Sequence, residues 1–496
     1  MMEDLRKKID EIDDEILRLY LKRLTLTDEI GKIKARSNAK VEVKDRESEI
    51  IKRLSKSLAC EDEKSVAALY NAIFSESKRR QNALAKKSDV NFKAALIGEN
   101  VSTSFSQILH SYFNTDYDLV SLKNEELKGF IENSGYDFFN VTMPYKREII
   151  PYLDQLIGAA KDIGVVNTVK VENDKKSGYN TDIDGLRYLF ESENVDLKDK
   201  NVVILGTGAT SLSAKYLAET SGAKKITAVG RTSLYNYRNY QSLDDTQILI
   251  NTTPIGKNSY ESLIDLTYFP HLEFVCDVIY SPLNTKLITD AKSLGVKCAG
   301  GLKMLIYQAA RAEEIWQEKP FTHKVEEIYD LLLKQIKNIV LIGMPSAGKT
   351  VIGKVLSEKL DRSFIDIDEE IEKNQSVSAA EIIESKGEEY FRDLETQTIK
   401  KFAYVKSSVI STGGGAVLKE ENITYLKQNS VIVYIDRDLK FLTDVCRPLS
   451  GLYGNEELFR KRKPLYEKYA DLTVKNDDEI DKIAERIIDA YENFSD

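Results

Sequence analysis

The sequence predicts a multidomain protein in which an all-helical N-terminal domain precedes two α/β domains. Its 496 residues exceed the size at which one hydrophobic core stops growing. Apolar residues recur at helical spacing near the N-terminus, whereas strand patterns that end in glycine-rich turns alternate with helical patterns further on. We therefore expect three domains, over residues 1–90, 91–335 and 336–496.

Composition limits the classes of partner. The formal net charge of −9 gives no reason to expect nucleic acid or an acidic membrane surface. The four cysteines stand far apart without a C-x-x-C pattern, which predicts free thiols in a reducing compartment. The first residues lack the apolar core of a signal peptide, and no run approaches a membrane span. We expect a cytoplasmic protein.

The N-terminal segment predicts one long amphipathic helix with a charge on its apolar stripe. Arg23 occupies a stripe position, and burying it without a partner would be costly. A later helix over residues 62–87 carries Ser77 and Gln81 one turn apart on its own stripe. These groups suggest a buried site for a small dianion, and the alternative is a helical hairpin whose Arg23 reaches solvent.

Together with other cations, this pattern resembles the all-helical chorismate mutases. The resemblance implies that the substrate chorismate is held by Arg6, Arg23, Lys34, Arg46, Glu47, Ser77 and Gln81. Arg6 and Arg23 lie about 25 Å apart along one helix, at 1.5 Å per residue. Because that distance is too long for one small ligand, one of the two comes from another chain. We expect an intertwined homodimer, which is also the family's arrangement.

The middle of the chain begins with a strand over residues 92–97 and continues as alternating strands and helices. Lys146 and Asp182 follow strand patterns, and such a pair can share a proton across a bound hydroxyl or carbonyl. Hydroxyl and amide side chains on neighbouring loops suit a polyol acid, and they are Ser104, Ser106, Thr142 and Asn167.

A second half starts at the strand over residues 200–205, which turns at Gly206 and Gly208 into a helix. This is a dinucleotide-type turn without the usual third glycine. The next strand ends before Arg231 and Thr232, where a cation and a hydroxyl suit a 2′-phosphate and therefore NADP.

Residues 91–335 resemble shikimate dehydrogenase, which reduces 3-dehydroshikimate with NADPH. The resemblance implies a substrate subdomain (91–195), an NADP subdomain (196–300) and C-terminal helices that return to the first (301–335). It makes Lys146 and Asp182 the catalytic pair. It places around the substrate Ser104, Ser106, Thr142, Asn167, Tyr280 and Gln308, and around the cofactor Gly206, Gly208, Ala209, Arg231 and Thr232.

The last third opens on a P-loop. A strand over residues 339–342 runs into Gly343, and the spacing G-x-x-x-x-G-K-[ST] continues to Thr350. The backbone N–H groups of such a loop face a phosphate chain, and its lysine reaches the outer phosphates. The next strand ends in Asp366 and Asp368, which strand alternation places on one side.

Residues 336–496 resemble shikimate kinase. The resemblance implies that Gly343, Gly348 and Lys349 bind ATP, and that Thr350 and Asp366 hold Mg²⁺. It assigns Asp368 to the hydroxyls of shikimate and Arg447 to the phosphates. The carboxylate and ring of shikimate would contact Arg392, Arg462, Gly413, Gly414 and Gly415.

The three resemblances together predict a trifunctional enzyme of aromatic amino acid biosynthesis. Its small-molecule substrates would be chorismate, 3-dehydroshikimate, shikimate and ATP. One alternative is a bifunctional dehydrogenase–kinase whose N-terminal helices serve for dimerisation or effector binding. Another is a regulator that uses ATP at its P-loop as a switch.

Overall fold

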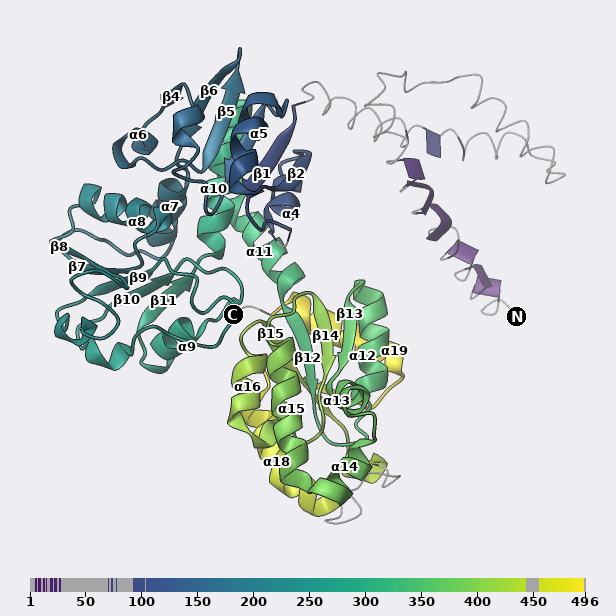
Figure 1. Ribbon diagram of the computed structural model, residues 1–496. Coiled ribbons are helices and arrows are strands. Elements are labelled where there is room, and N and C mark those ends of the chain that lie inside the picture. The colour runs from purple at the N-terminus through teal and green to yellow at the C-terminus, as the bar shows by residue number, and fades with distance from the viewer. Residues whose placement is uncertain are drawn as a thin grey trace. The chain divides into compact units, whose positions relative to one another are not determined.

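The computed structural model describes residues 92–102, 104–442 and 455–494, and also scattered positions within 5–27 and 70–77. The chain forms two compact units, residues 1–93 and 94–496, and Figure 1 shows the elements of the second unit as sheets flanked by helices.

In the N-terminal unit, the described positions within 5–27 and 70–77 are helical. Its described stripe residues Leu5, Ile9 and Ile12 are 56%, 56% and 57% exposed within the single chain. Leu24 and Phe74, by contrast, are buried. Leu24 and Phe74 lie outside the predicted stripe, so the described apolar residues of that stripe are largely uncovered by their own chain.

The first α/β layer of the second unit is a six-stranded mixed sheet in the order β2-β1-β3-β5-β6-β4. Strand β1 is central to a parallel group with β2 and β3, and β5 and β6 form an antiparallel hairpin. The strands are β1 (Ala94–Gly98), β2 (Tyr117–Ser121), β3 (Phe138–Val141), β4 (Gln155–Leu156), β5 (Thr168–Glu172) and β6 (Lys175–Tyr179). The helices are α4 (Ser106–Ser111), α5 (Leu127–Asn133), α6 (Ala159–Ile163) and α7 (Asp182–Ser192).

The second layer is a five-stranded parallel sheet in the order β11-β10-β9-β7-β8. Apolar clusters lie on both of its faces, which is why its strands read as continuous hydrophobic runs. The strands are β7 (Asn201–Leu205), β8 (Lys225–Val229), β9 (Ile248–Asn251), β10 (Phe274–Asp277) and β11 (Lys297–Gly300), and the helices are α8 (Ala209–Thr220) and α9 (Lys286–Ser293).

Two helices lead back to the first sheet. Helix α10 (Leu302–Gln317) packs against α7, α4 and β5, and α11 (Val325–Ile336) packs against α10. The Trp316 indole N–H donates to the Val169 carbonyl of β5 at 3.1 Å. Helix α10 thereby brings its own side chains to the carboxyl edge of the first sheet.

The last layer is a five-stranded parallel sheet in the order β13-β14-β12-β15-β16. Helices α12 and α19 pack against each other, as do α15 and α16 (Figure 1). The strands are β12 (Asn338–Ile342), β13 (Ser363–Asp366), β14 (Ser408–Ser411), β15 (Ser430–Asp436) and β16 (Leu472–Lys475). The helices are α12 (Lys349–Leu360), α13 (Ile367–Gln375), α14 (Ala379–Lys386), α15 (Glu388–Phe402), α16 (Glu420–Leu426), α18 (Asn455–Tyr469) and α19 (Ile480–Glu492).

One predicted boundary is wrong. Strand β13 ends at Asp366, and Asp368 belongs to the first turn of α13 rather than to the strand. The Asp366 carboxylate accepts hydrogen bonds from the backbone N–H groups of Asp368 and Glu369, so it caps the helix. Helix capping, and not strand alternation, sets the directions of these two carboxylates.

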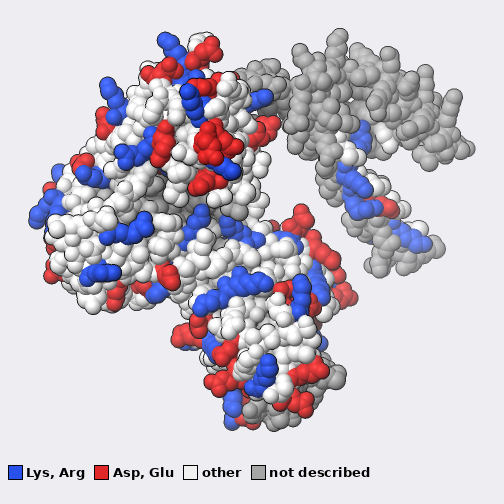
Figure 2. Space-filling view, in the orientation of Figure 1, with Lys and Arg blue, Asp and Glu red and all other residues white. Residues whose placement is uncertain are grey.

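The visible surface carries mixed charge. Figure 2 shows Lys and Arg interspersed with Asp and Glu over the described residues on this face, without a field of one sign. None of the helices within the described residues has the length and apolarity needed to cross a membrane. Of the predicted thiols, Cys276 is free and buried and Cys298 is free and half-buried, and Cys60 and Cys446 lie outside the described residues.

Candidate active sites

A pocket of about 200 Å³ lies at the carboxyl edge of the first sheet. Its walls come from β1, β3, the start of α7 and one face of α10. The pocket is lined by every substrate or acid–base residue predicted for this domain, which are Ser104, Ser106, Thr142, Lys146, Asn167, Asp182, Tyr280 and Gln308.

Lys146 and Asp182 form an ion pair inside this pocket. The Lys146 ammonium lies 2.6 Å from Asp182 Oδ2, and the two side chains are only 12% and 8% exposed. Asp182 is the first residue of α7, and its Oδ1 accepts a hydrogen bond from Asn167 Nδ2 at 2.8 Å. The pair is thus held in one geometry and can exchange a proton with a bound oxygen.

Behind this pair lies a buried polar network. Asn140 lines the pocket, its Nδ2 donates to Thr168 Oγ1 at 3.0 Å, and Thr168 Oγ1 donates to Asn167 Oδ1 at 3.1 Å. Tyr117 Oη donates to Asn140 Oδ1 at 2.6 Å. Burial, together with the nearby Glu313 carboxylate, raises the pKa of Tyr117 well above its ordinary value.

Sequence reasoning missed Asn140 and Tyr117 as site residues. Asn140 stands two residues before Thr142 at the end of β3, and strand alternation puts both on the same side of the sheet, so its position could have been predicted. Tyr117 comes from β2 and reaches Asn140 only through the sheet pairing, for which the local sequence gives no signal.

The dinucleotide-type turn joins β7 to α8. Gly206 has φ +108°, and a Cβ there would meet Thr252 Oγ1 at 2.7 Å. Gly208 precedes Ala209, the first residue of α8, so the positive end of that helix faces the turn. Arg231 and Thr232 follow β8 directly at the same edge of the sheet.

Position 230 leaves little room for a side chain larger than that of glycine. A Cβ at this position would lie 2.6 Å from Thr207 Cγ2, in the turn after β7. A larger residue would have to displace the Thr207 side chain.

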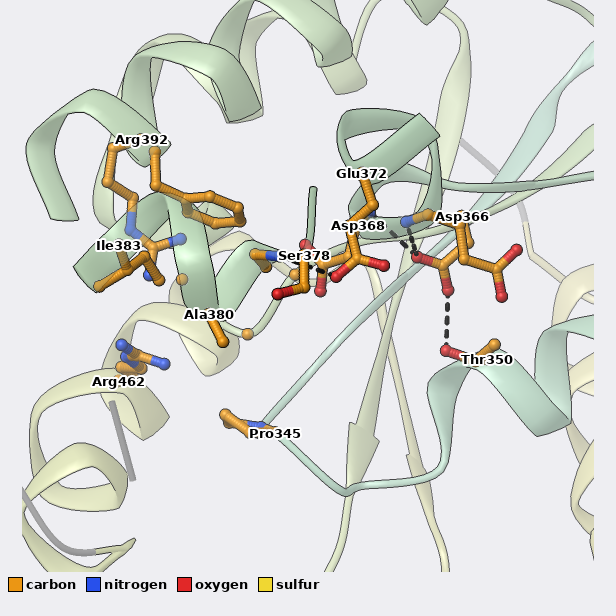
Figure 3. Close-up of a pocket in the computed structure, with 16 residues that line it drawn as sticks. Pro345, Thr350, Asp366, Asp368, Glu372, Ser378, Ala380, Ile383, Arg392 and Arg462 are labelled. Carbon is orange, nitrogen blue, oxygen red and sulfur yellow. Dashed lines mark hydrogen bonds between the residues drawn. The ribbon is translucent and has the colours of Figure 1, made fainter. Parts of the chain in front are cut away.

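A second pocket, of about 370 Å³, lies beside the P-loop (Figure 3). Arg392 and Arg462 lie at one end of it, and Thr350 and Asp366 at the other. The predicted residues that line it are Thr350, Asp366, Asp368, Arg392, Gly413, Gly414, Gly415 and Arg462. A pocket with cations at one end and carboxylates at the other fits a small hydroxylated anion.

The two arginines are 7% and 3% exposed. Arg392 Nη1 donates to Glu395 Oε2 at 2.8 Å, and Arg392 Nη2 donates to Glu388 Oε1 at 3.2 Å. Burial lowers the pKa of Arg462, and the neighbouring Arg392 charge acts in the same direction. An added anion would relieve this repulsion.

Glu395 is a third residue that sequence reasoning missed. Its carboxyl is buried, and burial raises its pKa although the Arg392 charge opposes the shift. It stands three residues after Arg392 on α15, a spacing at which helical side chains are neighbours. Gly415 packs so closely that an added Cβ would lie 2.2 Å from Arg392 Cζ, so a larger residue there would displace the Arg392 guanidinium.

The P-loop connects β12 to α12. Gly343 and Gly348 have φ +146° and +91°, and the Lys349 ammonium donates to the Gly343 and Met344 carbonyls, both at 3.0 Å. Thr350 Oγ1 donates to Asp366 Oδ2 at 2.8 Å. A hydroxyl and a carboxylate side by side are the oxygen ligands that Mg²⁺ accepts, so the donor set fits this ion.

In the N-terminal unit the structure brings two predicted residues together. Arg23 Nη1 donates to Ser77 Oγ at 2.7 Å, and the guanidinium lies 5.7 Å from the centre of the Phe74 ring. Arg6 is exposed. The remaining predicted site residues lie outside the described residues, and they are Lys34, Arg46, Glu47, Gln81 and Arg447.

A P-loop beside an anion pocket, in one chain with a dinucleotide-type sheet and a buried lysine–carboxylate pair, defines a multifunctional enzyme that combines an oxidoreductase with a phosphotransferase. Three family models match the chain. Residues 5–82 match chorismate mutase type II, residues 96–169 the shikimate dehydrogenase substrate-binding domain, and residues 345–492 shikimate kinase.

Curated relatives match the middle of the chain. The shikimate dehydrogenase (NADP(+)) of Alkaliphilus oremlandii is 36% identical over 258 residues, which cover 45% of this chain and 90% of the relative. That of Methanococcus vannielii is 35% identical over 277 residues, with 48% and 96% covered. A chorismate mutase/shikimate 5-dehydrogenase fusion protein from Clostridium acetobutylicum has a solved structure that is 29% identical, with a TM-score of 0.46 and coverage of 49% and 97%.

The chain belongs to the shikimate dehydrogenase family. A chorismate mutase domain precedes the dehydrogenase part of the chain, and a shikimate kinase domain follows it. It is a trifunctional enzyme of the shikimate pathway.

Proposed function

We propose that the first pocket reduces 3-dehydroshikimate to shikimate, with Lys146 and Asp182 as its acid–base pair. The observation that carries this assignment is their 2.6 Å contact inside a pocket of hydroxyl and amide groups. Bound NADPH would supply the hydride. Lys146 Nζ would give a proton to the carbonyl oxygen that becomes a hydroxyl, and Asp182 would keep the ammonium in place.

The cofactor of this reaction is NADP(H), as the names of the two curated relatives suggest. The β7–α8 turn with Gly206, Gly208 and Ala209 would hold the pyrophosphate on the helix N-terminus. Arg231 and Thr232 would contact the 2′-phosphate, because a guanidinium and a hydroxyl suit a dianion.

The second pocket would phosphorylate shikimate with ATP. Arg392 and Arg462 would grip the carboxylate of shikimate, and Asp368 would orient the attacking hydroxyl. Lys349 would contact the outer phosphates, Thr350 and Asp366 would hold Mg²⁺, and Arg447 would close over the phosphates. What supports this assignment is the placement of buried cations and carboxylates at opposite ends of one pocket beside the P-loop (Figure 3).

The N-terminal domain would rearrange chorismate to prephenate. The reaction is unimolecular, so it requires a compact substrate geometry and cations near the developing oxygen charge. Arg23, held by Ser77, would be one of these cations. Lys34, Arg46, Glu47 and Gln81 would complete the site.

This domain would also form an intertwined homodimer. Leu5, Ile9, Ile12, Leu19 and Leu26 each leave half or more of their surface exposed in the single chain. A continuous apolar stripe of this kind needs cover, and a second copy of the same helix supplies it. The same arrangement would bring the partner copy of Arg6 to the site that contains Arg23.

Domain boundaries at 1–90, 91–335 and 336–496 accompany these assignments. The end of α11 at Ile336 and the start of β12 at Asn338 support the second boundary. A cytoplasmic location remains a prediction from the sequence.

The experiment is a three-way assay of the full chain. The wild type and the variants Arg23→Ala, Lys146→Met and Lys349→Met are each assayed for all three reactions. We expect each variant to lose one activity and to keep the other two. A wild type that makes no prephenate while remaining dimeric would replace the mutase assignment by a dimerisation or effector-binding role. ATP consumption independent of shikimate would remove the kinase assignment.

A further inference from the structure

Arg437 is a cation beside the P-loop that none of the assignments above uses. It follows the last residue of β15, which pairs in parallel with the P-loop strand β12. Its Nη1 atom lies 3.8 Å from where a Cβ of Gly348 would stand. On the same side, the Asn476 amide lies 2.9 Å from that point and donates to the Ala347 carbonyl at 2.7 Å. Two strand ends therefore bring polar groups against the loop.

The charge of Arg437 is not balanced within the part of the chain that the structure describes. The guanidinium has no hydrogen bond or ion pair there, and its Nε atom is buried without an acceptor. The residue as a whole is partly exposed, but a buried N–H group without an acceptor is unfavourable. The next described carboxylate along the chain, Asp438, is exposed and pairs with Lys440.

Other positive groups lie close by. Helix α12 begins at Lys349, so the positive end of its dipole lies at the Gly348 turn. The Lys349 ammonium lies against the carbonyls of the same loop. A helix N-terminus, an ammonium and a guanidinium around one loop repel one another until an anion lies among them.

We propose that Arg437 binds the phosphate chain of the kinase's nucleotide. A guanidinium presents paired N–H donors that match two phosphate oxygens, and Nη1 of Arg437 is the donor placed at the Gly348 turn. Arg437 does not line the pocket that holds Arg392 and Arg462, so it acts on the nucleotide and not on the acid that is phosphorylated. This inference rests on the proposed kinase function.

The test compares Arg437→Met, Arg437→Lys and the control Lys440→Met in the full chain. Lys440 is an exposed lysine three residues further on, so its variant removes the same charge from the same segment. We expect Arg437→Met to raise the KM for ATP and the Kd for ADP about tenfold to hundredfold, because a charge-assisted hydrogen bond is lost. The KM for shikimate should change less than about twofold, and Arg437→Lys should recover part of the loss.

Adenosine, which lacks phosphates, separates a phosphate contact from a base contact. As a competitor of ATP it should inhibit the wild type and Arg437→Met with equal constants. The proposal is overturned if Arg437→Met weakens the binding of adenosine as much as that of ADP. It is also overturned if the KM for ATP is unchanged in Arg437→Met. An unchanged KM for shikimate in the kinase reaction shows that the kinase domain of the variant is folded. A wild type without shikimate-dependent ATP use would contradict the kinase assignment instead, and ADP binding would still test Arg437.

Discussion

The Lys146 ammonium and the Asp182 carboxylate lie 2.6 Å apart, in a pocket where both side chains are almost buried. Lys146 follows β3, whereas Asp182 begins α7, so the contact depends on the whole first sheet. The Asn167 amide, which donates to the second oxygen of Asp182, fixes the orientation of the carboxylate. The geometry suits a proton transfer that needs little reorganisation.

Removing either member of this pair should abolish most dehydrogenase activity. For Lys146→Met and Asp182→Asn we expect kcat for NADPH oxidation with 3-dehydroshikimate to fall about 10²- to 10⁴-fold, the usual contribution of a general acid–base group. The kinase rate of the same preparation serves as the internal control. A kcat within threefold of the wild type would contradict the assignment.

Tyr117→Phe should destabilise the first sheet and slow the dehydrogenase. The change leaves the buried Asn140 Oδ1 without its donor, which costs about 1–3 kcal/mol of unfolding free energy. Urea unfolding measures the loss. Tyr216→Phe is the matched control, because its hydroxyl donates to Asp162 at the surface and its removal should cost much less.

Thr350→Val and Asp366→Asn should each weaken the binding of Mg²⁺ in the kinase site. The two side chains share a 2.8 Å hydrogen bond, and each would offer one oxygen to the ion. We expect the Mg²⁺ concentration for half-maximal activity to rise about 10- to 100-fold, measured at fixed ATP and shikimate. If the Mg²⁺ titrations of wild type and variants coincide, these residues do not hold the ion.

Asp277 should make stability depend on pH in an unusual direction. Burial raises the pKa of this carboxyl from 3.8 to about 6, although hydrogen bonds from Thr285, Ile279 and Asn251 oppose the shift. Between about pH 4 and pH 6 the folded state therefore binds more protons than the unfolded state. The free energy of unfolding should fall as pH rises through this window, by about 3 kcal/mol, and the contribution should be constant above it.

Asp277→Asn isolates this contribution. Urea unfolding of the wild type and the variant from pH 4 to pH 7 gives two curves whose difference contains the titration of Asp277. We expect the difference to change across pH 4 to 6 and to stay level above it. A difference that is constant over the whole range would show that the carboxyl titrates normally.

Mixing two inactive variants tests the proposed dimer. Arg6→Ala and Arg23→Ala should each lose mutase activity. If one pocket takes Arg6 from one protomer and Arg23 from the other, a mixed dimer retains one intact pocket, and random exchange should restore about a quarter of the wild-type rate. No recovery after confirmed exchange would place both residues in the same protomer's site.

Much of the architecture follows from local patterns in the sequence. The P-loop and the β7–α8 turn could be predicted because strand, glycine spacing and helix lie next to each other in the chain. Lys146, Asp182 and Arg392 could be placed because short motifs surround them. The prediction that the strand includes Asp368 was wrong, since Asp366 caps a helix that begins at Ile367.

The residues that were missed depend on contacts between distant segments. Tyr117 meets Asn140 across paired strands, and Arg437 meets the Gly348 turn because β15 lies beside β12. Strand order decides both contacts. Patterns within a short window of sequence contain no information about it.

The passage from α11 to β12 consists of one residue, Lys337, between Ile336 and Asn338. Ile336 is buried in the apolar cluster formed with α10, and Asn338 is already part of the kinase sheet. A gene fusion of this kind has no spacer in which length could vary freely. Inserting one residue at the end of α11 would rotate the last residue of the helix by about 100° about the helix axis. The connection between α11 and β12 should therefore tolerate substitutions far better than insertions or deletions.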